Sequence, residues 1–240
     1  MHTDLQEQDR PQLLARRAEV AAALAAALPR HAILSRPEDT TPYECDGLTA
    51  YRAQPLVVVL PETEAQVAAV LKICHALQVP VVARGAGTGL SGGAMPHRLG
   101  VTLSLAKFNR ILQIDTQACT ATVQCGVRNL AISEAAASYG LYYAPDPSSQ
   151  IACTIGGNVA ENSGGVHCLK YGLTLHNVLR VRGFTVEGEE VEFGSEALDT
   201  PGLDLLPLVI GSEGMLAVTV EVTVKLVPKP QLARCVMASF

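Results

Sequence analysis

The chain has 240 residues, of which 48% are hydrophobic and 17% are charged, so it can bury a sizeable core in one or two domains. Its formal net charge of −5 argues against a nucleic-acid-binding surface. No apolar run reaches the roughly 20 residues of a membrane span, and the N-terminus lacks the basic and apolar regions of a secretory signal. The seven cysteines are scattered without a C-x-x-C pair, which is typical of a protein in the reducing cytosol.

Apolar periodicity and turn residues predict helices and strands along most of the chain. The expected elements, in chain order, are a helix over 11–28, a strand over 56–60, a helix over 63–77 with Thr63 as its N-cap, strands over 80–83, 100–105, 111–115 and 120–124, a helix over 127–139, an irregular region over 144–174, and strands over 178–186, 189–193 and 218–226. Residues 56–83 therefore form a β-α-β unit whose second strand leads into a glycine-rich turn. Ligands of such units gather at the carboxyl ends of the strands.

The glycine-rich turn, VVARGAGTGLSGG over residues 81–93, places five glycines within nine residues. Glycine lets a ligand approach the backbone, and successive N–H groups in such a turn bind anions. Thr88 and Ser91 add hydroxyl donors, while Arg84 either forks onto phosphate oxygens or fixes the end of the strand. The turn lacks the lysine of a Walker motif, and no helix follows it as a nicotinamide-binding fingerprint requires. A glycine-rich hairpin loop without a ligand is the alternative at this point.

Two later segments have the same small-residue character. Residues 144–165 read APDPSSQIACTIGGNVAENSGG, and residues 211–214 read GSEG. One such segment is easily explained as a loop, but three separate close approaches of the backbone are not. Together they predict one long ligand that lies across several loops.

Six segments, taken in this order, resemble the FAD-binding domain of the vanillyl-alcohol-oxidase/PCMH flavoprotein superfamily: residues 84–89, 145–149, 154–158, 163–165, 169–172 and 211–214. The nearest branch is the D-2-hydroxyacid dehydrogenases, and within it the bacterial glycolate oxidase subunits. The resemblance covers about residues 40–230 and is more specific for the FAD domain than for the substrate. It implies an α+β fold, a PCMH-type FAD-binding domain of two α/β subdomains with FAD in the cleft between them.

The resemblance also implies roles for individual residues. The turn over 85–89 would hold the FAD diphosphate, residues 145–146 and 154–158 would line the isoalloxazine and ribityl side, and the backbone of Val218 would contact adenine. Met215 stands where family members often have threonine, so a hydroxyl is missing there. The expected cofactor-binding residues are Arg84, Gly85, Ala86, Gly87, Thr88, Gly89, Ser91, Pro145, Asp146, Thr154, Gly156, Gly157, Asn158, Asn162, Ser163, Gly164, Tyr171, Gly172, Gly211, Glu213, Gly214 and Val218.

The histidines carry no recognisable catalytic or metal-binding pattern, because the six of them lack the spacing of metal ligands. We therefore expect no catalytic and no metal-binding residue in this sequence. Some superfamily members tether FAD through a histidine, but His97 and His167 lie outside the turn and are interpreted as ordinary loop residues. We expect non-covalent FAD. Lys170 is either a solvated lysine or a cation near the flavin, where it would favour the reduced form.

The expected organisation is a helical arm and connection over 1–52 and the FAD-binding domain over 53–230, with lobes at about 53–106 and 107–230. Residues 231–240 then read as the start of a missing cap domain. The resemblance implies that a cap domain carries the substrate-binding and metal-binding residues. We therefore expect a fragment that is inactive on its own.

The function implied by the resemblance is that of an FAD-dependent 2-hydroxyacid dehydrogenase. Glycolate or D-lactate would be oxidised to the 2-oxoacid by hydride transfer to flavin N5, and electrons would pass to companion flavin and iron–sulfur subunits. The first alternative is a non-catalytic FAD-binding or assembly subunit of such a complex. A further alternative is another substrate, such as D-2-hydroxyglutarate or an alkyl-ether precursor. We expect no nucleic acid, no transmembrane segment, and a cytoplasmic location that is peripheral at the inner membrane only through partner subunits.

Overall fold

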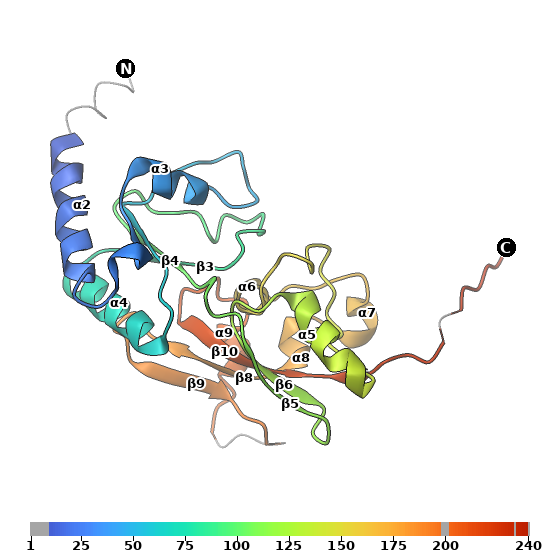
Figure 1. Ribbon diagram of the computed structural model, residues 1–240. Helices are drawn as coiled ribbons and strands as arrows, with labels where there is room; N and C mark the ends of the chain where they lie inside the picture. Colours follow the sequence, from blue (N-terminus) through green and yellow to red (C-terminus); the bar gives the residue numbers. More distant parts are fainter. Residues whose placement is uncertain (1–9, 198–201, 233, 240) are drawn as a thin grey trace.

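The computed structural model describes residues 10–197, 202–232 and 234–239. It is a mixture of helices and sheets, as the sequence predicts (Figure 1). The elements lie, in chain order, at α2 (Arg10–Leu24), η1 (Arg30–Ala32), β1 (Ile33–Leu34), α3 (Pro37–Thr40), η2 (Thr41–Tyr43), β2 (Val57–Val59), α4 (Glu64–Ala76), β3 (Val81–Arg84), β4 (Val101–Ser104), β5 (Ile111–Asp115), β6 (Thr120–Gln124), α5 (Asn129–Ala136), η3 (Ala137–Tyr139), β7 (Leu141–Tyr142), α6 (Ile155–Glu161), α7 (Cys168–Tyr171), α8 (Thr174–Asn177), β8 (Val178–Phe184), β9 (Glu190–Gly194), α9 (Leu206–Val209), β10 (Val218–Lys225) and β11 (Val227–Pro228).

The first sheet contains the predicted β-α-β unit. Its strand order is β1-β2-β4-β3, and both β2 and β3 run parallel to β4, which lies between them. The unit is therefore confirmed, with a later strand inserted at its centre. Because the parallel strands end at one edge of the sheet, the chain leaves β3 at the edge where ligands of such sheets bind.

Helix α4 begins where the sequence predicts. The Thr63 hydroxyl accepts the N–H of Gln66, and the Gln66 side chain accepts the N–H of Thr63, which completes a capping box. The helix then buries Val67, Val70 and Leu71 against the sheet. Burial of such side chains contributes about 1.5–3 kcal/mol each.

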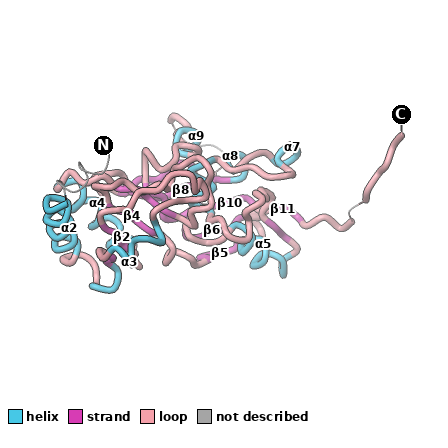
Figure 2. Tube along the Cα trace, turned by 90° about the horizontal axis from the view of Figure 1, so that it is seen from above, coloured by secondary structure: helices cyan, strands magenta, loops and turns pink. Residues whose placement is uncertain are grey.

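The second sheet is antiparallel, in the order β5-β6-β10-β8-β9. One hydrophobic cluster joins it to the first sheet, since Phe184, Val218 and Val220 pack with residues of β2, β4 and α4. Arg182 of β8 also makes two hydrogen bonds of 2.6 and 2.7 Å to the carboxylate of Glu64. Figure 2 shows α2 and α4 at one end of the molecule and α5 and α7 at the other.

The region over 144–174, which the sequence predicts to be irregular, contains helices α6 and α7, and α8 begins at its last residue. The prediction was wrong for α6 because the pair Gly156-Gly157 has low helix propensity, and tertiary contacts override it. Asn162 ends α6 in the left-handed conformation, with φ of 51°. Among the described residues, no helix is both long enough and apolar enough to cross a membrane.

Candidate cofactor site

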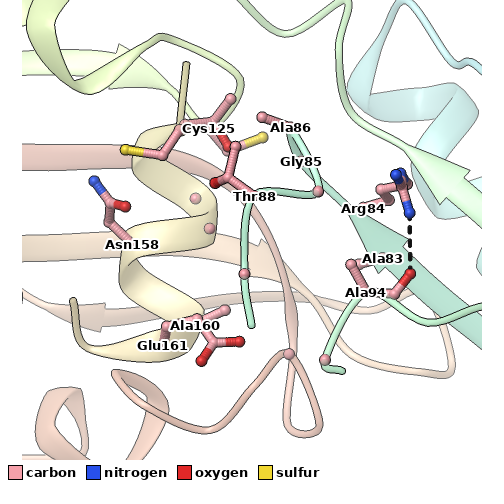
Figure 3. A pocket seen from close by; sticks show the side chains of 18 of the residues that line it. Ala83, Arg84, Gly85, Ala86, Thr88, Ala94, Cys125, Asn158, Ala160 and Glu161 are labelled. Carbon is pink, nitrogen blue, oxygen red and sulfur yellow. Dashed lines mark hydrogen bonds between the residues drawn. The ribbon is translucent and has the colours of Figure 1, made fainter. Parts of the chain in front are cut away.

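A pocket lies between the glycine-rich segment that follows β3 and helix α6 (Figure 3). Strand β6 contributes Cys125 at its C-terminal side, and β10 contributes Thr219. The pocket thus brings together several segments that are far apart in the sequence. The predicted residues that line it are Arg84, Gly85, Ala86, Gly87, Thr88, Gly89, Thr154, Gly156, Gly157, Asn158, Ser163, Glu213 and Gly214.

The glycine-rich segment offers a row of free hydrogen-bond donors. Within the described residues, no backbone N–H from Gly85 to Gly93 donates to a protein acceptor. The five glycines of this run are half-buried, and the residues between them are exposed. Half-buried N–H groups normally have partners, so free donors at the glycines are suited to a ligand rich in oxygen. A diphosphate is such a ligand, because successive backbone N–H groups form an anion-binding concavity.

Thr154 faces this segment from the N-terminus of α6. Its side-chain oxygen is buried and has no hydrogen-bond partner. A β-carbon at Gly85 would overlap that oxygen and lie 3.9 Å from the N–H nitrogen of Gly157. The side of Gly85 that would carry a β-carbon is therefore filled by the Thr154 hydroxyl, so only glycine fits at position 85. An unpartnered hydroxyl beside free backbone N–H groups fits a site for a phosphate group.

Cys125 forms part of the pocket wall and packs closely against the first turn of α6. The N–H of Gly156 donates to the carbonyl of Cys125 at 2.8 Å, and a β-carbon at Gly156 would lie 2.7 Å from the Cys125 side chain. Burial raises the pKa of the Cys125 thiol to about 12. This thiol is therefore a neutral part of the wall at neutral pH.

Arg84 lines the pocket, but its guanidinium contacts other protein groups. One guanidinium nitrogen donates to the carbonyl of Ala94 at 3.2 Å, and the group lies 5.7 Å from the centre of the Tyr43 ring. Gly87, with φ of +70°, covers the guanidinium, which a β-carbon there would overlap. Figure 3 shows the side chain turned away from α6. Of the two roles that the sequence allows for Arg84, these contacts support fixing the end of the strand.

The GSEG segment is held against the C-terminus of α6. The N–H groups of Gly211 and Glu213 donate to the carbonyls of Val159 and Ala160, both at 2.8 Å. These bonds satisfy carbonyls that the end of a helix leaves free. Glu213 adopts a φ of 53°, which is uncommon for a residue with a side chain, and its carboxylate stands at the rim of the pocket.

Asn158 connects the pocket to the turn over 145–149. Its side-chain nitrogen donates to Asn129 at 2.8 Å, and the Asn129 nitrogen donates to the carbonyl of Pro145 at 2.9 Å. All three groups are buried. This chain of hydrogen bonds fixes the predicted Pro145 corner relative to α6, and Asn129 is a positioning residue that the sequence analysis missed.

Asp146 and Tyr171 line a second hollow on the other side of the turn, between α5 and α7. The Asp146 carboxylate lies 2.7 Å from His167 Nδ1, and the Tyr142 and Tyr171 rings meet edge to face at 6.3 Å. Gln150 also lines this hollow, whereas Ser149 lines the first pocket. The turn over 145–150 therefore separates the two spaces.

The other predicted residues do not line the pocket. The Asn162 side chain accepts the N–H of Leu175 at 3.0 Å, and Val218 is buried between the sheets. Ser91 lies outside the pocket lining and donates to Glu161, which lines it. The remaining predicted residues outside the pocket are Gly164, Gly172 and Gly211.

The pocket also contains residues that the sequence analysis did not name. They are Ala83, Gly93, Ala94, Leu105, Cys125, Ser149, Cys153, Ala160, Glu161, Ala217 and Thr219. Most are small residues adjacent to predicted ones, so widening each motif by one or two positions would have found them. Leu105 and Cys125 carry no motif and could not have been found in this way.

Comparison with known proteins gives a consistent result. A family model described as an FAD binding domain matches residues 55–194. The glycolate oxidase subunit GlcD of Escherichia coli (strain K12) is 62% identical over 93% of this chain and 45% of its own length. The D-lactate dehydrogenase of Anaerostipes hadrus is 40% identical over 78% of this chain and 39% of its own length. The chain thus spans less than half the length of these relatives.

A solved structure of alkyldihydroxyacetonephosphate synthase superposes with a TM-score of 0.79 over 90% of this chain and 41% of that chain, at 22% sequence identity. At this low sequence identity the superposition shows that the two chains share a fold. The matched residues 55–194 make up more than half of the chain and include both the glycine-rich segment and α6. The chain therefore belongs to the family of FAD binding domains.

Proposed function

We propose that this chain is the FAD-binding part of a flavin-dependent 2-hydroxyacid dehydrogenase that acts on glycolate or D-lactate. The observation that carries the proposal is the row of free backbone N–H groups that begins at Gly85, beside the unpartnered hydroxyl of Thr154. The relatives named glycolate oxidase subunit and D-lactate dehydrogenase support the substrate class. Bound FAD supplies the acceptor for the hydride that leaves the α-carbon of the 2-hydroxyacid.

The residues of the pocket would divide the binding of FAD between them. The N–H groups of 85–89 and the Thr154 hydroxyl would bind the diphosphate. Leu105, Cys125 and Ala217 are buried and would exclude water from the inner wall. The turn over 145–149, held by Asn129, would orient the flavin end. This arrangement agrees with the proposed division into lobes at about 53–106 and 107–230, with the cofactor between them.

We propose that FAD is bound without a covalent link. No histidine is among the described residues that line the pocket. The two cysteines that do line it, Cys125 and Cys153, are buried, and the thiol of Cys125 is held in its neutral form. A neutral thiol is a poor nucleophile.

The test is to reconstitute the purified chain with FAD and pass it through a desalting column. The expected result is one retained flavin per chain, with absorbance bands near about 370 and 450 nm, and release of all the colour on acid precipitation. ADP should compete with FAD more strongly than AMP does, because the N–H groups of 85–89 would bind a diphosphate and AMP has only one phosphate group. Loss of all flavin on desalting would contradict the proposal, and colour retained in the precipitate would contradict the non-covalent link.

The alternative function is a non-catalytic FAD-binding subunit of the same kind of complex. One observation favours it. The described residues that line the pocket include no histidine, the commonest general base, and one of the two carboxylates there, that of Glu161, already accepts the Ser91 hydroxyl. Anaerobic addition of glycolate or D-lactate to the FAD-loaded chain separates the two functions. Bleaching of the 450 nm band, at about the position expected for oxidised flavin, supports catalysis, and a stable spectrum supports the alternative. Companion flavin and iron–sulfur subunits remain part of the proposal in either case.

A further inference from the structure

A single hydrogen bond closes the pocket at the tip of the glycine-rich segment. The Ser91 hydroxyl donates to the carboxylate of Glu161 at 2.7 Å, although the two residues are 70 positions apart. Ser91 lies near the end of the segment over residues 85–93, and Glu161 is the last residue of α6; both side chains are exposed. The bond therefore joins the outer end of the segment to the outer end of the helix.

Two glycines beside Ser91, Gly89 and Gly93, also lie close to the Glu161 carboxylate. A β-carbon at Gly93 would lie 2.9 Å from a Glu161 carboxylate oxygen, and a β-carbon at Gly89 would lie 3.7 Å from it. Residues 89, 91 and 93 thus all face the same carboxylate. Gly47 also lies close to this segment, since a β-carbon there would lie 2.7 Å from the carbonyl oxygen of Gly89 and 2.9 Å from that of Thr88.

On the α6 side, Ser91 to Glu161 is the one side-chain hydrogen bond that residues 85–93 make within the described chain. At the inner end of the pocket, Gly85 packs against Thr154, the residue before α6. The segment, the hydrogen bond and the helix therefore form a closed ring around the space where the diphosphate would lie. A long ligand enters or leaves this ring most easily when the hydrogen bond opens.

We propose that Glu161 is a cofactor-positioning residue that acts through Ser91 and holds the glycine-rich segment closed over bound FAD. This inference rests on the proposed binding of FAD. Glu161 acts as a hydrogen-bond acceptor and not as a charge, because a carboxylate beside a diphosphate is electrostatically unfavourable. A neutral acceptor of the same shape should therefore serve as well.

The test is the rate at which FAD dissociates from the reconstituted chain, measured by the recovery of flavin fluorescence after dilution. Ser91→Ala and Glu161→Ala should each accelerate dissociation about five-fold to ten-fold, the effect of losing one short hydrogen bond. The double variant should dissociate no faster than either single variant, because both changes remove the same bond. Glu161→Gln keeps an acceptor oxygen and should restore a rate close to that of the wild type.

Ser138→Ala and Glu187→Ala serve as matched controls, because both residues are exposed and lie outside the pocket. The thermal unfolding midpoints of the FAD-free variants should lie within about 2–4 °C of the wild type, the shift expected for one hydrogen bond, which separates positioning from a loss of folding. Unchanged dissociation rates overturn the inference, as does a double variant whose effect is the product of the two single effects. A Glu161→Gln variant as fast as Glu161→Ala overturns it too. A wild-type chain that binds no FAD instead overturns the proposed function itself.

Discussion

Gly85 lies directly against the hydroxyl of Thr154, so closely that a β-carbon at position 85 would overlap that oxygen. Gly85 does not adopt a positive φ, so glycine is required there for space and not for backbone conformation. The contact joins the end of β3 to the start of α6 and defines the inner end of the cofactor pocket.

Replacing Gly85 with alanine should therefore weaken cofactor binding. The added methyl group would meet the Thr154 hydroxyl and force the glycine-rich segment away from the start of α6, so FAD affinity should fall by about 100-fold, on the order of 3 kcal/mol. The same overlap should lower the free energy of unfolding by about 1–3 kcal/mol. Fluorescence titration with FAD measures the affinity, and circular dichroism checks the fold. Ser138→Ala is the control, because Ser138 is exposed and lies outside the pocket. Equal affinity of the Gly85→Ala variant and the wild type would show that the contact between Gly85 and Thr154 does not shape the cofactor site.

Thr154→Val should change stability and binding in opposite directions. Valine has the shape of threonine, so it removes an unpartnered buried hydroxyl, and the free energy of unfolding of the FAD-free protein should rise or stay level. FAD affinity should fall by about five-fold to thirty-fold, because the phosphate loses a donor. Thr154→Ser keeps the hydroxyl and should bind FAD like the wild type. The two measurements are urea unfolding and FAD titration, and a valine variant that binds FAD normally would exclude a role for the hydroxyl.

Arg84→Ala should lower the free energy of unfolding and leave the salt dependence of FAD affinity unchanged. The guanidinium holds the carbonyl of Ala94 and lies over Tyr43, so its removal should cost about 1–3 kcal/mol of unfolding free energy. A phosphate clamp would behave differently, since its loss would leave stability unchanged and make FAD affinity less sensitive to salt. Measuring affinity at low and high ionic strength in the two proteins decides between these roles.

The cysteines should differ sharply in reactivity. Burial raises the pKa of Cys125 and of Cys74 to about 12, so both should remain unlabelled by an alkylating reagent at pH 8, while the exposed Cys168 and Cys235 react. The folded state keeps these protons when the unfolded chain releases them at a pH near 9, the ordinary value for a thiol. The contribution of these thiols to stability is therefore complete below pH 9 and declines toward pH 12. Mass spectrometry after timed labelling measures the reactivity, and fast labelling of Cys125 in the folded protein would contradict its burial.

Much of the fold could be predicted from local patterns. The strands over 111–115 and 120–124 have the predicted bounds because alternating residues and turn residues delimit them. The start of α4 at Thr63 could be predicted because its capping box is a local pattern that spans four residues, from Thr63 to Gln66. The insertion of β4 between β2 and β3 could not be predicted, since strand order depends on contacts between distant segments. Helix α6 was missed because Gly156 and Gly157 are weak helix formers, yet their lack of side chains is what lets the helix approach Cys125.

The sequence by itself determined that the chain is an FAD binding domain, because its glycine-rich segments stand in the order typical of that family. It also predicts that these segments serve one long ligand, since glycine lets a ligand approach the backbone. Only the tertiary structure decided which of those residues share a pocket. It turned the Arg84 guanidinium toward Ala94, separated Asp146 and Tyr171 into a second hollow, and placed Glu161 across from Ser91. The physical reason is that a motif specifies the local backbone, whereas the direction and the partner of each side chain depend on neighbours that are distant in the sequence.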